Sequence, residues 1–181
     1  MAVIQKHSSA ATSLNQVPAL HKRFVDPSTA MPVVKPGLVL DYGGGRYDTA
    51  SAFLADHGYS PIVYDPFNRS NAHNEGALQI MRDRGPQAVL MANVLNVIDS
   101  EENYTDTLEH AASFAAPLFI SCYEGDRMGE GFETKKGWQR NETLTQHFNR
   151  IDGIFPNRIV KRIGNVIIVY HRRIPADYKG A

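Results

Sequence analysis

The sequence predicts an α/β protein whose mostly parallel sheet is completed by a C-terminal antiparallel hairpin. Three observations lead to this fold class. Short apolar runs alternate with segments of helical spacing, as in a parallel sheet with crossover helices. A glycine-rich turn follows the first of these runs. Two further runs near the C-terminus are joined through Gly164-Asn165, which is typical of a hairpin turn.

The chain before the first strand is expected to form an N-terminal extension, residues 1–35. Pro18, Pro27 and Pro32 interrupt this segment, so that only a short helix around 17–24 fits within it. The folded domain is expected to span 36–173. The remaining residues, 174–181, are expected to form a disordered tail.

The parallel part of the sheet is predicted from short apolar runs that turn residues close. These strands are expected at 38–40, 62–64, 88–91 and 118–121. Segments of helical spacing follow the first three strands, at 49–55, 75–84 and 101–114. Either Asp99 or Ser100 is a suitable N-cap for the last of these helices.

The C-terminal third begins with a stretch rich in glycine and charged residues, 124–140. This stretch is expected to form either a long loop or a small hairpin. A helix at 141–149 is expected next, with Asn141 as its cap. The terminal hairpin is predicted from the β-rich runs 158–162 and 165–171.

Composition excludes several classes of protein. The 181 residues suffice for one domain with a core. Lys plus Arg equal Asp plus Glu at 19 each, so overall charge does not attract the chain to nucleic acid or to a membrane surface. No apolar run reaches the length of a membrane helix. The single cysteine, Cys122, forms no intrachain disulfide, and this favours a reducing, cytoplasmic location.

The glycine turn, Asp41-Tyr42-Gly43-Gly44-Gly45, stands between a strand and a helix, where bare backbone can approach a ligand closely. Asp48 occupies the position at which a dinucleotide fingerprint has its third small residue, and it places negative charge where a pyrophosphate would lie. Carboxylates around this turn favour a ligand that lacks phosphates and carries ammonium and sulfonium charge. S-adenosylmethionine is such a ligand.

Asp65 ends the next predicted strand, where a carboxylate can accept two hydrogen bonds from a ribose diol. A simpler interpretation stays open beside this one. Asp41 and Asp48 could simply accept hydrogen bonds from backbone amides, and Asp65 could simply begin an Asp-Pro turn.

The run from Val39 to Asp65 is similar to motifs I and II of class I (Rossmann-like) S-adenosylmethionine-dependent methyltransferases, whose D-x-G-x-G is represented by Asp41, Gly43 and Gly45. In that family an antiparallel pair completes the sheet. The resemblance implies a cofactor site formed by Asp41, Gly43, Gly44, Gly45, Asp48, Asp65, Pro66, Phe67, Asn93 and Val94.

A narrower resemblance covers about residues 37–170. The segments D-Y-G-G-G-R-Y-D, Y-D-P-F-N-R, A-N-V-L-N-V-I-D and G-F-E-T-K-K-G-W-Q resemble small methyltransferase-like proteins of phages and bacteria, including ones associated with DNA phosphorothioation. One departure from the wider superfamily concerns 66–87, which has room for a single helix where a strand and a helix are usual. The sheet is therefore expected to be reduced there, with adenine contacted by Phe67 and by polar groups of 71–74.

Methyl transfer from a sulfonium requires mainly that the acceptor be aligned, and a base only if the acceptor must lose a proton. Candidate catalytic residues are Tyr123, Glu124 and Asp126, which follow the fourth predicted strand at the sheet edge where ligands bind. The alternative is that these charged loop residues are simply solvated. Cys122 is similarly a conceivable nucleophile, but a buried inert thiol is the more usual role.

Candidate acceptor-binding residues lie in two stretches. Asn96 follows the third predicted strand together with Asn93, although Asn93 can also serve as a turn residue. Within the stretch 124–140, cations flank the only tryptophan, a combination that holds unpaired bases. The candidates there are Lys135, Lys136, Trp138 and Arg140. A loop-packing role for Trp138 stays open.

The sequence therefore predicts methyl transfer to a nucleic acid, a nucleotide or another small molecule. Histidines are scattered without the spacing of metal ligands, so no metal is expected. Two rivals remain: a catalytically silent cofactor-binding accessory protein, and an enzyme that consumes the cofactor by another reaction.

Overall fold

The computed structural model describes residues 10–171. The predicted tail, 174–181, lies outside this range. The central sheet contains six strands in the order β2-β1-β3-β4-β8-β7. Their bounds are Leu38–Tyr42 for β1, Ser60–Tyr64 for β2, Ala88–Ala92 for β3, Leu118–Ser121 for β4, Ile159–Ile163 for β7 and Val166–Tyr170 for β8.

Strands β1 to β4 are parallel, and the terminal hairpin β7–β8 adds an antiparallel pair to the edge of β4. The predicted fold class is thereby confirmed. Strand β1 pairs with β2 on one side and with β3 on the other, so the chain changes direction across the sheet at β1. In open α/β sheets, ligands bind at such a switch point, outside the carboxyl ends of the strands.

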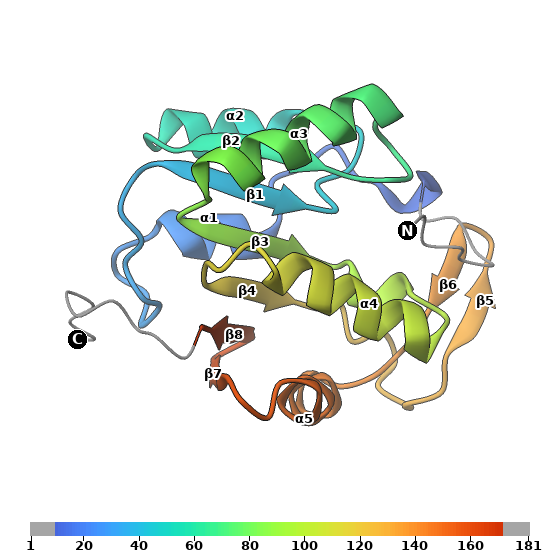
Figure 1. Cartoon of the computed structure of the whole chain (residues 1–181). Helices are drawn as coiled ribbons and strands as arrows, with labels where there is room; N and C mark the ends of the chain where they lie inside the picture. Colours follow the sequence, from blue (N-terminus) through green and yellow to red (C-terminus); the bar gives the residue numbers. More distant parts are fainter. Residues whose placement is uncertain (1–9, 172–181) are drawn as a thin grey trace.

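Helices cover both faces of the sheet (Figure 1). Helices α1 (Ala19–Val25) and α2 (Thr49–Asp56) contribute Leu20, Phe24 and Leu54 to the core of one face. Helices α3 (Asn71–Arg84), α4 (Glu101–Ala112) and α5 (Leu144–Ile154) pack on the other. Because both faces are covered, β1 is buried along its whole length, which accounts for its unbroken apolar start.

The expected reduction of the sheet is present. Strand β2 is the edge of the central sheet in the described part of the chain, and the segment after it contains the single helix α3. The side chain of Ser70 caps this helix by accepting a hydrogen bond from His73 N. Ser100 similarly caps α4 through Asn103 N, which decides between the two predicted caps.

Residues 124–140 contain a small hairpin, β5 (Phe132–Thr134) paired with β6 (Gly137–Gln139). Figure 1 shows this hairpin on the side toward which the arrowheads of β1 and β3 point. The remaining elements are two short 3-10 turns, η1 (Ala10–Thr12) before α1 and η2 (Leu95–Val97) after β3.

The predicted start of the last helix is wrong. Helix α5 begins at Leu144, and its cap is Thr143, which forms a reciprocal capping box with Gln146. Asn141 instead has a left-handed backbone (φ 56°), and its side chain donates a hydrogen bond to the carbonyl of Glu130. Asn141 therefore turns the chain before the helix rather than capping it.

Candidate cofactor pocket

A cavity of about 300 Å³ lies at the carboxyl ends of β1, β2 and β3. Nine of the ten predicted cofactor-binding residues line it: Asp41, Gly43, Gly44, Gly45, Asp65, Pro66, Phe67, Asn93 and Val94. The N-terminal segment closes it from another side with Thr12, Ser13, Leu14, Gln16 and Pro18, and α1 adds Ala19 and His21. A cavity of this size is within the range of small-molecule sites.

The glycine turn forms a wall of bare backbone that side chains would disrupt. Gly43 and Gly45 both have φ of 77°, a conformation that favours glycine. A Cβ on Gly43 would overlap Val94, and one on Gly45 would overlap the Ser13 hydroxyl. A Cβ on Gly44 would stand 2.6 Å from Oδ2 of Asp41. The three glycines therefore allow the turn to pack directly on Val94, Ser13 and Asp41.

Asp65 is held firmly beside this turn and is only 4% exposed. Its Oδ2 accepts a hydrogen bond from Gly45 N at 2.9 Å, and its Oδ1 accepts from Phe67 N and Asn68 N at 2.9 and 3.0 Å. The Asn68 side-chain amide donates to both carboxylate oxygens, at 3.2 and 3.1 Å. Asp65 is thus a turn residue that also lines the cavity, and its contact with a ribose diol stays a prediction.

Asn74 supports Asp65 from the first turns of α3. Its Oδ1 accepts from Asp65 N at 2.9 Å, and its Nδ2 donates to the Asp65 carbonyl at 3.0 Å. The adenine contact expected from 71–74 is not built by these residues, because they form the start of a helix and none of them lines the cavity. Asn68 lines it instead.

Asp48 is the one predicted cofactor residue that does not line the cavity. Its side chain is 78% exposed and forms an ion pair with Arg69 at 2.7 Å. Arg69 also donates from Nε to the carbonyl of Gly45, so this pair braces the turn from outside. The negative charge at the cavity therefore comes from Asp41 and Asp65.

Asn93 ends β3 with a left-handed backbone (φ 57°), which asparagine tolerates better than most residues. Its N–H donates to the carbonyl of Ser121 at 2.8 Å. This turn brings Val94 against Gly43. Asn93 thus forms a turn and also lines the cavity, and its contact with a ligand stays a prediction.

His21 is a cavity residue that sequence reasoning missed. Its Nε2 lies 3.1 Å from Oδ1 of Asp41, with side-chain exposures of 1% and 2%. The position of His21 on a short predicted helix does not indicate that it contacts Asp41, because the two residues are far apart in the sequence.

The segment before α1 was missed for the same reason. Ser13 Oγ accepts a hydrogen bond from Arg46 N at 3.0 Å, and Asn15 bonds to the Thr49 hydroxyl. These contacts fasten the N-terminal extension onto the glycine turn and the start of α2. The extension is thus part of the site.

The predicted catalytic residues stand apart from the cavity. Glu124 accepts the N–H of Leu144 at 2.6 Å, at the start of α5, and pairs with Arg127 at 2.8 Å. Asp126 accepts the N–H of Met128 within a turn. Tyr123 is 62% exposed. None of the three lines the cavity, and the two acids have local structural partners.

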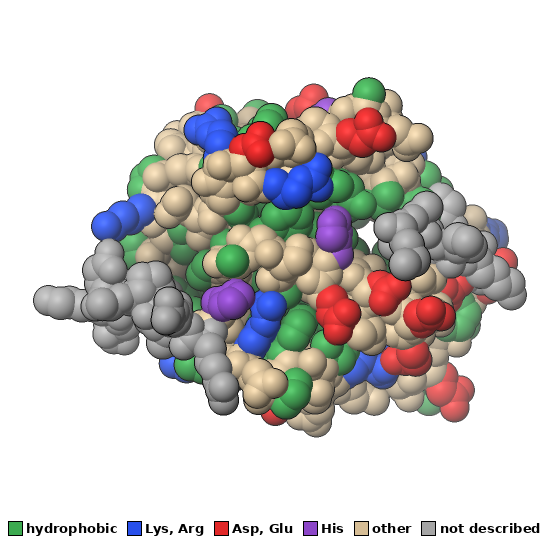
Figure 2. Space-filling model, viewed as in Figure 1, with side chains coloured by type: hydrophobic (Ala, Val, Ile, Leu, Met, Phe, Trp, Pro, Cys, Tyr) green, Lys and Arg blue, Asp and Glu red, His purple; other side chains and the backbone are tan. Residues whose placement is uncertain are grey.

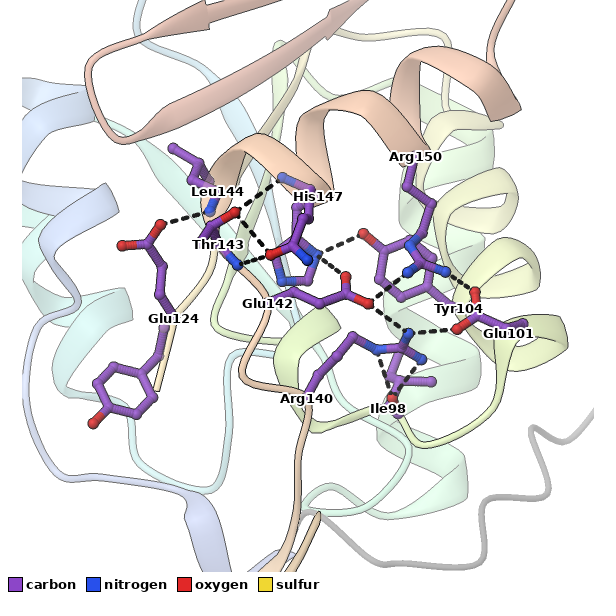
Figure 3. Close-up of polar contacts among 12 residues, drawn as sticks. Ile98, Glu101, Tyr104, Glu124, Arg140, Glu142, Thr143, Leu144, His147 and Arg150 are labelled. Carbon is purple, nitrogen blue, oxygen red and sulfur yellow. Dashed lines mark hydrogen bonds and ion pairs between the residues drawn. The ribbon is translucent and has the colours of Figure 1, made fainter. Parts of the chain in front are cut away.

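Arg140, a predicted acceptor residue, is instead the centre of a buried polar cluster (Figure 3). Its Nε and Nη2 donate to the carbonyl of Ile98, and its Nη1 pairs with Glu101 and Glu142. The guanidinium lies over the Tyr104 ring at 4.9 Å from its centroid. Because each of its three guanidinium nitrogens has a protein partner, Arg140 fastens the chain just after β6, and an acceptor contact for it stays a prediction.

Of the other predicted acceptor residues, some are packed against the domain and some are exposed. Asn96 is 3% exposed and donates to Gln139 Oε1 at 3.3 Å, which links η2 to β6. Trp138 lies against Gly131, where a Cβ would overlap the indole. Lys135 and Lys136 are exposed at the tip of the β5–β6 hairpin.

No three His, Cys, Asp or Glu side chains gather as a metal site within residues 10–171. Among the helices of that same part of the chain, none is long and apolar enough to cross a membrane.

With this geometry in place, comparison with known proteins defines the class of fold. No family model and no curated protein matches the chain. An O-methyltransferase family protein from Burkholderia thailandensis is similar with a TM-score of 0.51 and 13% identity, over 86% of this chain and 56% of that chain. A SAM-dependent methyltransferase from Aquifex aeolicus has a TM-score of 0.42 and 18% identity, over 84% and 96%.

The architecture is therefore the α/β fold of methyltransferases, with a mostly parallel sheet and an antiparallel C-terminal hairpin. The chain spans 56% of the length of the Burkholderia protein. At this identity the likeness shows the fold alone. The narrower resemblance to phage and bacterial proteins and the cytoplasmic location stay predictions.

Proposed function

We propose that this protein binds S-adenosylmethionine in the cavity and transfers its methyl group to an acceptor at the carboxyl edge of the sheet. One observation carries the proposal. A turn of bare glycines stands between two buried carboxylates, Asp41 and Asp65, at the switch point of the sheet. Two carboxylates at such a turn suit a cationic nucleoside and oppose a pyrophosphate.

The residues present fit the cofactor. Asp65 lines the cavity beside Phe67, so a ribose diol and an adenine ring would find a carboxylate and an apolar surface together. The backbone of Gly43–Gly45 allows close approach, since nothing projects from it. Bound S-adenosylmethionine supplies a methyl group that its sulfonium has already activated. The chain's own contribution is then to hold the ligand and align the acceptor.

The β5–β6 hairpin is the proposed acceptor side. Fewer residues are proposed to contact the acceptor there than the sequence analysis expected. Lys135 and Lys136 are exposed on it, and Trp138 stiffens it against Gly131. Arg140 and Asn96 hold the hairpin to the domain from below. An acceptor with negative charge, a nucleic acid or a nucleotide, suits this surface best. Tyr123, Glu124 and Asp126 stay predictions as acid–base residues.

A methyl-label assay tests the proposal. The protein is incubated with S-adenosylmethionine carrying a labelled methyl group and, in turn, with DNA, RNA, nucleotides and a small-molecule extract. We expect transfer into one of these fractions. Replacing both Lys135 and Lys136 by Ala should lower kcat/KM about tenfold, the effect of roughly 1.4 kcal/mol.

Lys35→Ala is the matched control, because Lys35 is exposed just before the amino end of β1, away from the cavity. It should leave transfer unchanged. Cofactor binding without label in any fraction would contradict methyl transfer and favour a silent binding protein. Loss of the cofactor without labelled product would point to another reaction of the ligand.

A further inference from the structure

Exposed apolar side chains gather at the carboxyl edge of the sheet. Among residues 10–171, the large hydrophobic side chains that are exposed are Leu14, Val33, Tyr47, Tyr123, Met128 and Phe132. Leu14 and Tyr47 line the cavity, and the last three lie between β4 and β6. Of this set, Val33 alone lies elsewhere, before β1. Single exposed apolar residues are ordinary, whereas a group of them beside a cavity indicates a contact surface.

Gln139 brings two of these residues, Tyr123 and Phe132, to the same side of the β5–β6 hairpin. Phe132 is paired with Gln139 across the hairpin, so their side chains leave on the same face. The Gln139 side chain donates from Nε2 to the carbonyl of Tyr123 at 3.2 Å. Tyr123, which is 62% exposed, therefore lies beside the hairpin face that carries Phe132, which is 50% exposed.

This hairpin face adjoins the wall of the cavity. Gln139 Oε1 accepts a hydrogen bond from Asn96 in η2, at 3.3 Å. Val94 and Val97, on either side of Asn96 in the sequence, both line the cavity. Phe132 is thus at the base of the hairpin, next to η2, while the exposed Lys135 and Lys136 are at its tip.

We propose that Tyr123 and Phe132 hold the acceptor by stacking on an unpaired nucleobase, and that Lys135 and Lys136 contact its neighbouring phosphates. This inference depends on the proposed function, because it names the acceptor class for that same site. Proteins hold single strands through exposed aromatic rings combined with cations. In a duplex the faces of the bases are covered by their neighbours, so surface rings have nothing to stack on.

The hairpin itself favours a nucleobase over other occupants. Glu133 is paired with Trp138 on the face opposite to Phe132, so the strand residues on the Phe132 face are uncharged. A protein partner or a second copy of this chain could cover the same rings. Such a partner gives no role to the exposed cations, Lys135 and Lys136, that follow directly at the tip.

Binding of labelled strands tests this inference. Fluorescent DNA and RNA strands of mixed sequence and about 12 nucleotides are titrated with the protein in the presence of S-adenosylhomocysteine, beside the same DNA annealed to its complement. We expect a single strand to bind about tenfold more tightly than the duplex. Replacing both Tyr123 and Phe132 by Ala should weaken single-strand binding about tenfold or more, because a stacked base contributes at least that factor.

The matched control keeps both rings. The double variant Tyr123→Phe with Phe132→Tyr should bind single strands within about twofold of the wild type, because stacking uses the ring face. Val33→Ala removes an exposed apolar side chain before β1 and should change nothing. S-adenosylhomocysteine binding should be the same in all variants, since neither Tyr123 nor Phe132 lines the cavity.

Three results would overturn the inference and leave the proposed cofactor site standing. They are equal binding of single strand and duplex, unchanged strand binding by the double alanine variant, and binding of S-adenosylhomocysteine without any strand. A wild-type dimer that the double alanine variant loses in light scattering would also overturn it, because a second copy would then cover these rings. If the alanine variant does not fold, the wild-type preference for single strand over duplex decides. Failure of the wild type to bind S-adenosylhomocysteine would reject the proposed function, and this inference with it.

Discussion

Several polar residues of this chain are buried for structural reasons, and the cluster around His147 is the clearest case. The Tyr104 hydroxyl lies 2.8 Å from Nδ1 of His147, and both side chains are fully buried. Arg150 joins Arg140 over the Tyr104 ring and also pairs with Glu142 (Figure 3). Burial and, second, the neighbouring Arg140 charge lower the pKa of His147 to about 4.

This lowered pKa predicts a pH dependence of stability. The unfolded chain, with an ordinary histidine near 6.5, binds more protons than the folded chain between about pH 4 and 6.5. The stabilising contribution of neutral His147 is therefore complete above pH 6.5 and is lost as pH falls toward 4. From pH 7.5 to 5 the loss should be about 2 kcal/mol.

Urea unfolding at the two pH values measures this loss. His147→Gln should show a smaller decrease than the wild type, by about the same 2 kcal/mol, because glutamine does not titrate. His57→Gln serves as the exposed control and should keep the wild-type decrease. A wild-type decrease no larger than that of His147→Gln would show that the buried ring does not titrate as described.

The surroundings of Cys122, a partly exposed residue just after β4, bear on its role. Loss of solvation, with the nearby charge of Glu142 as a smaller cause, raises the pKa of this thiol above its ordinary value. The thiol therefore stays protonated near neutral pH, whereas a nucleophile must be a thiolate. Of the two roles considered from the sequence, the inert one is favoured.

At the scale of elements, glycines have opposite roles in the turn and in α3. Gly45 has a positive φ and no room for a Cβ, whereas Gly76 lies in the exposed interior of a helix with nothing within 4 Å of an added Cβ. Gly45→Ala is expected to lower the free energy of unfolding by about 1–3 kcal/mol. Gly76→Ala should raise it by about 0.5–1 kcal/mol.

Chemical denaturation of the two alanine variants tests this contrast, since both make the same chemical change. Gly45→Ala should also weaken S-adenosylhomocysteine binding, because the displaced Ser13 belongs to the cavity wall. Gly76→Ala should leave binding unchanged. Equal stabilities for the two variants would mean that the turn is not constrained as described.

Elements with strong local signals could be predicted from the sequence. Strands β1, β3 and β4 each begin with an apolar run, and the glycine turn and Asp65 mark the ends of β1 and β2. The start of α5 was misplaced because Asn141 and Thr143 are both good caps, and only the left-handed backbone of Asn141 separates them. Local sequence does not encode that difference.

Site residues that belong to a local sequence motif could be predicted. Site residues brought together from distant segments could not. The cavity residues at the ends of β1, β2 and β3 were found from motifs. The contacts of Ser13 with Arg46 and of His21 with Asp41 join segments far apart in the sequence. No periodic pattern in the sequence predicts such contacts. The burial of Arg140 was not predicted, because a cation near a tryptophan looks the same in sequence whether it is exposed or buried.

At the scale of the whole molecule, the zero net charge conceals an uneven surface. Figure 2 shows acidic side chains gathered over α4, which exposes Glu101, Glu102, Asp106 and Glu109. A polyanionic acceptor is repelled from that face. The exposed Lys135 and Lys136 stand on the β5–β6 hairpin instead, so an anionic acceptor is expected to approach there.

On the proposed function, the cavity at the switch point of the sheet accepts S-adenosylmethionine and not a dinucleotide. Calorimetric titration of the wild-type protein with S-adenosylhomocysteine and with NAD, under the same conditions, tests it most directly. We expect saturable binding of S-adenosylhomocysteine at one site and no measurable heat with NAD, because the buried carboxylates of Asp41 and Asp65 oppose a pyrophosphate. Tight NAD binding with no response to S-adenosylhomocysteine would contradict it.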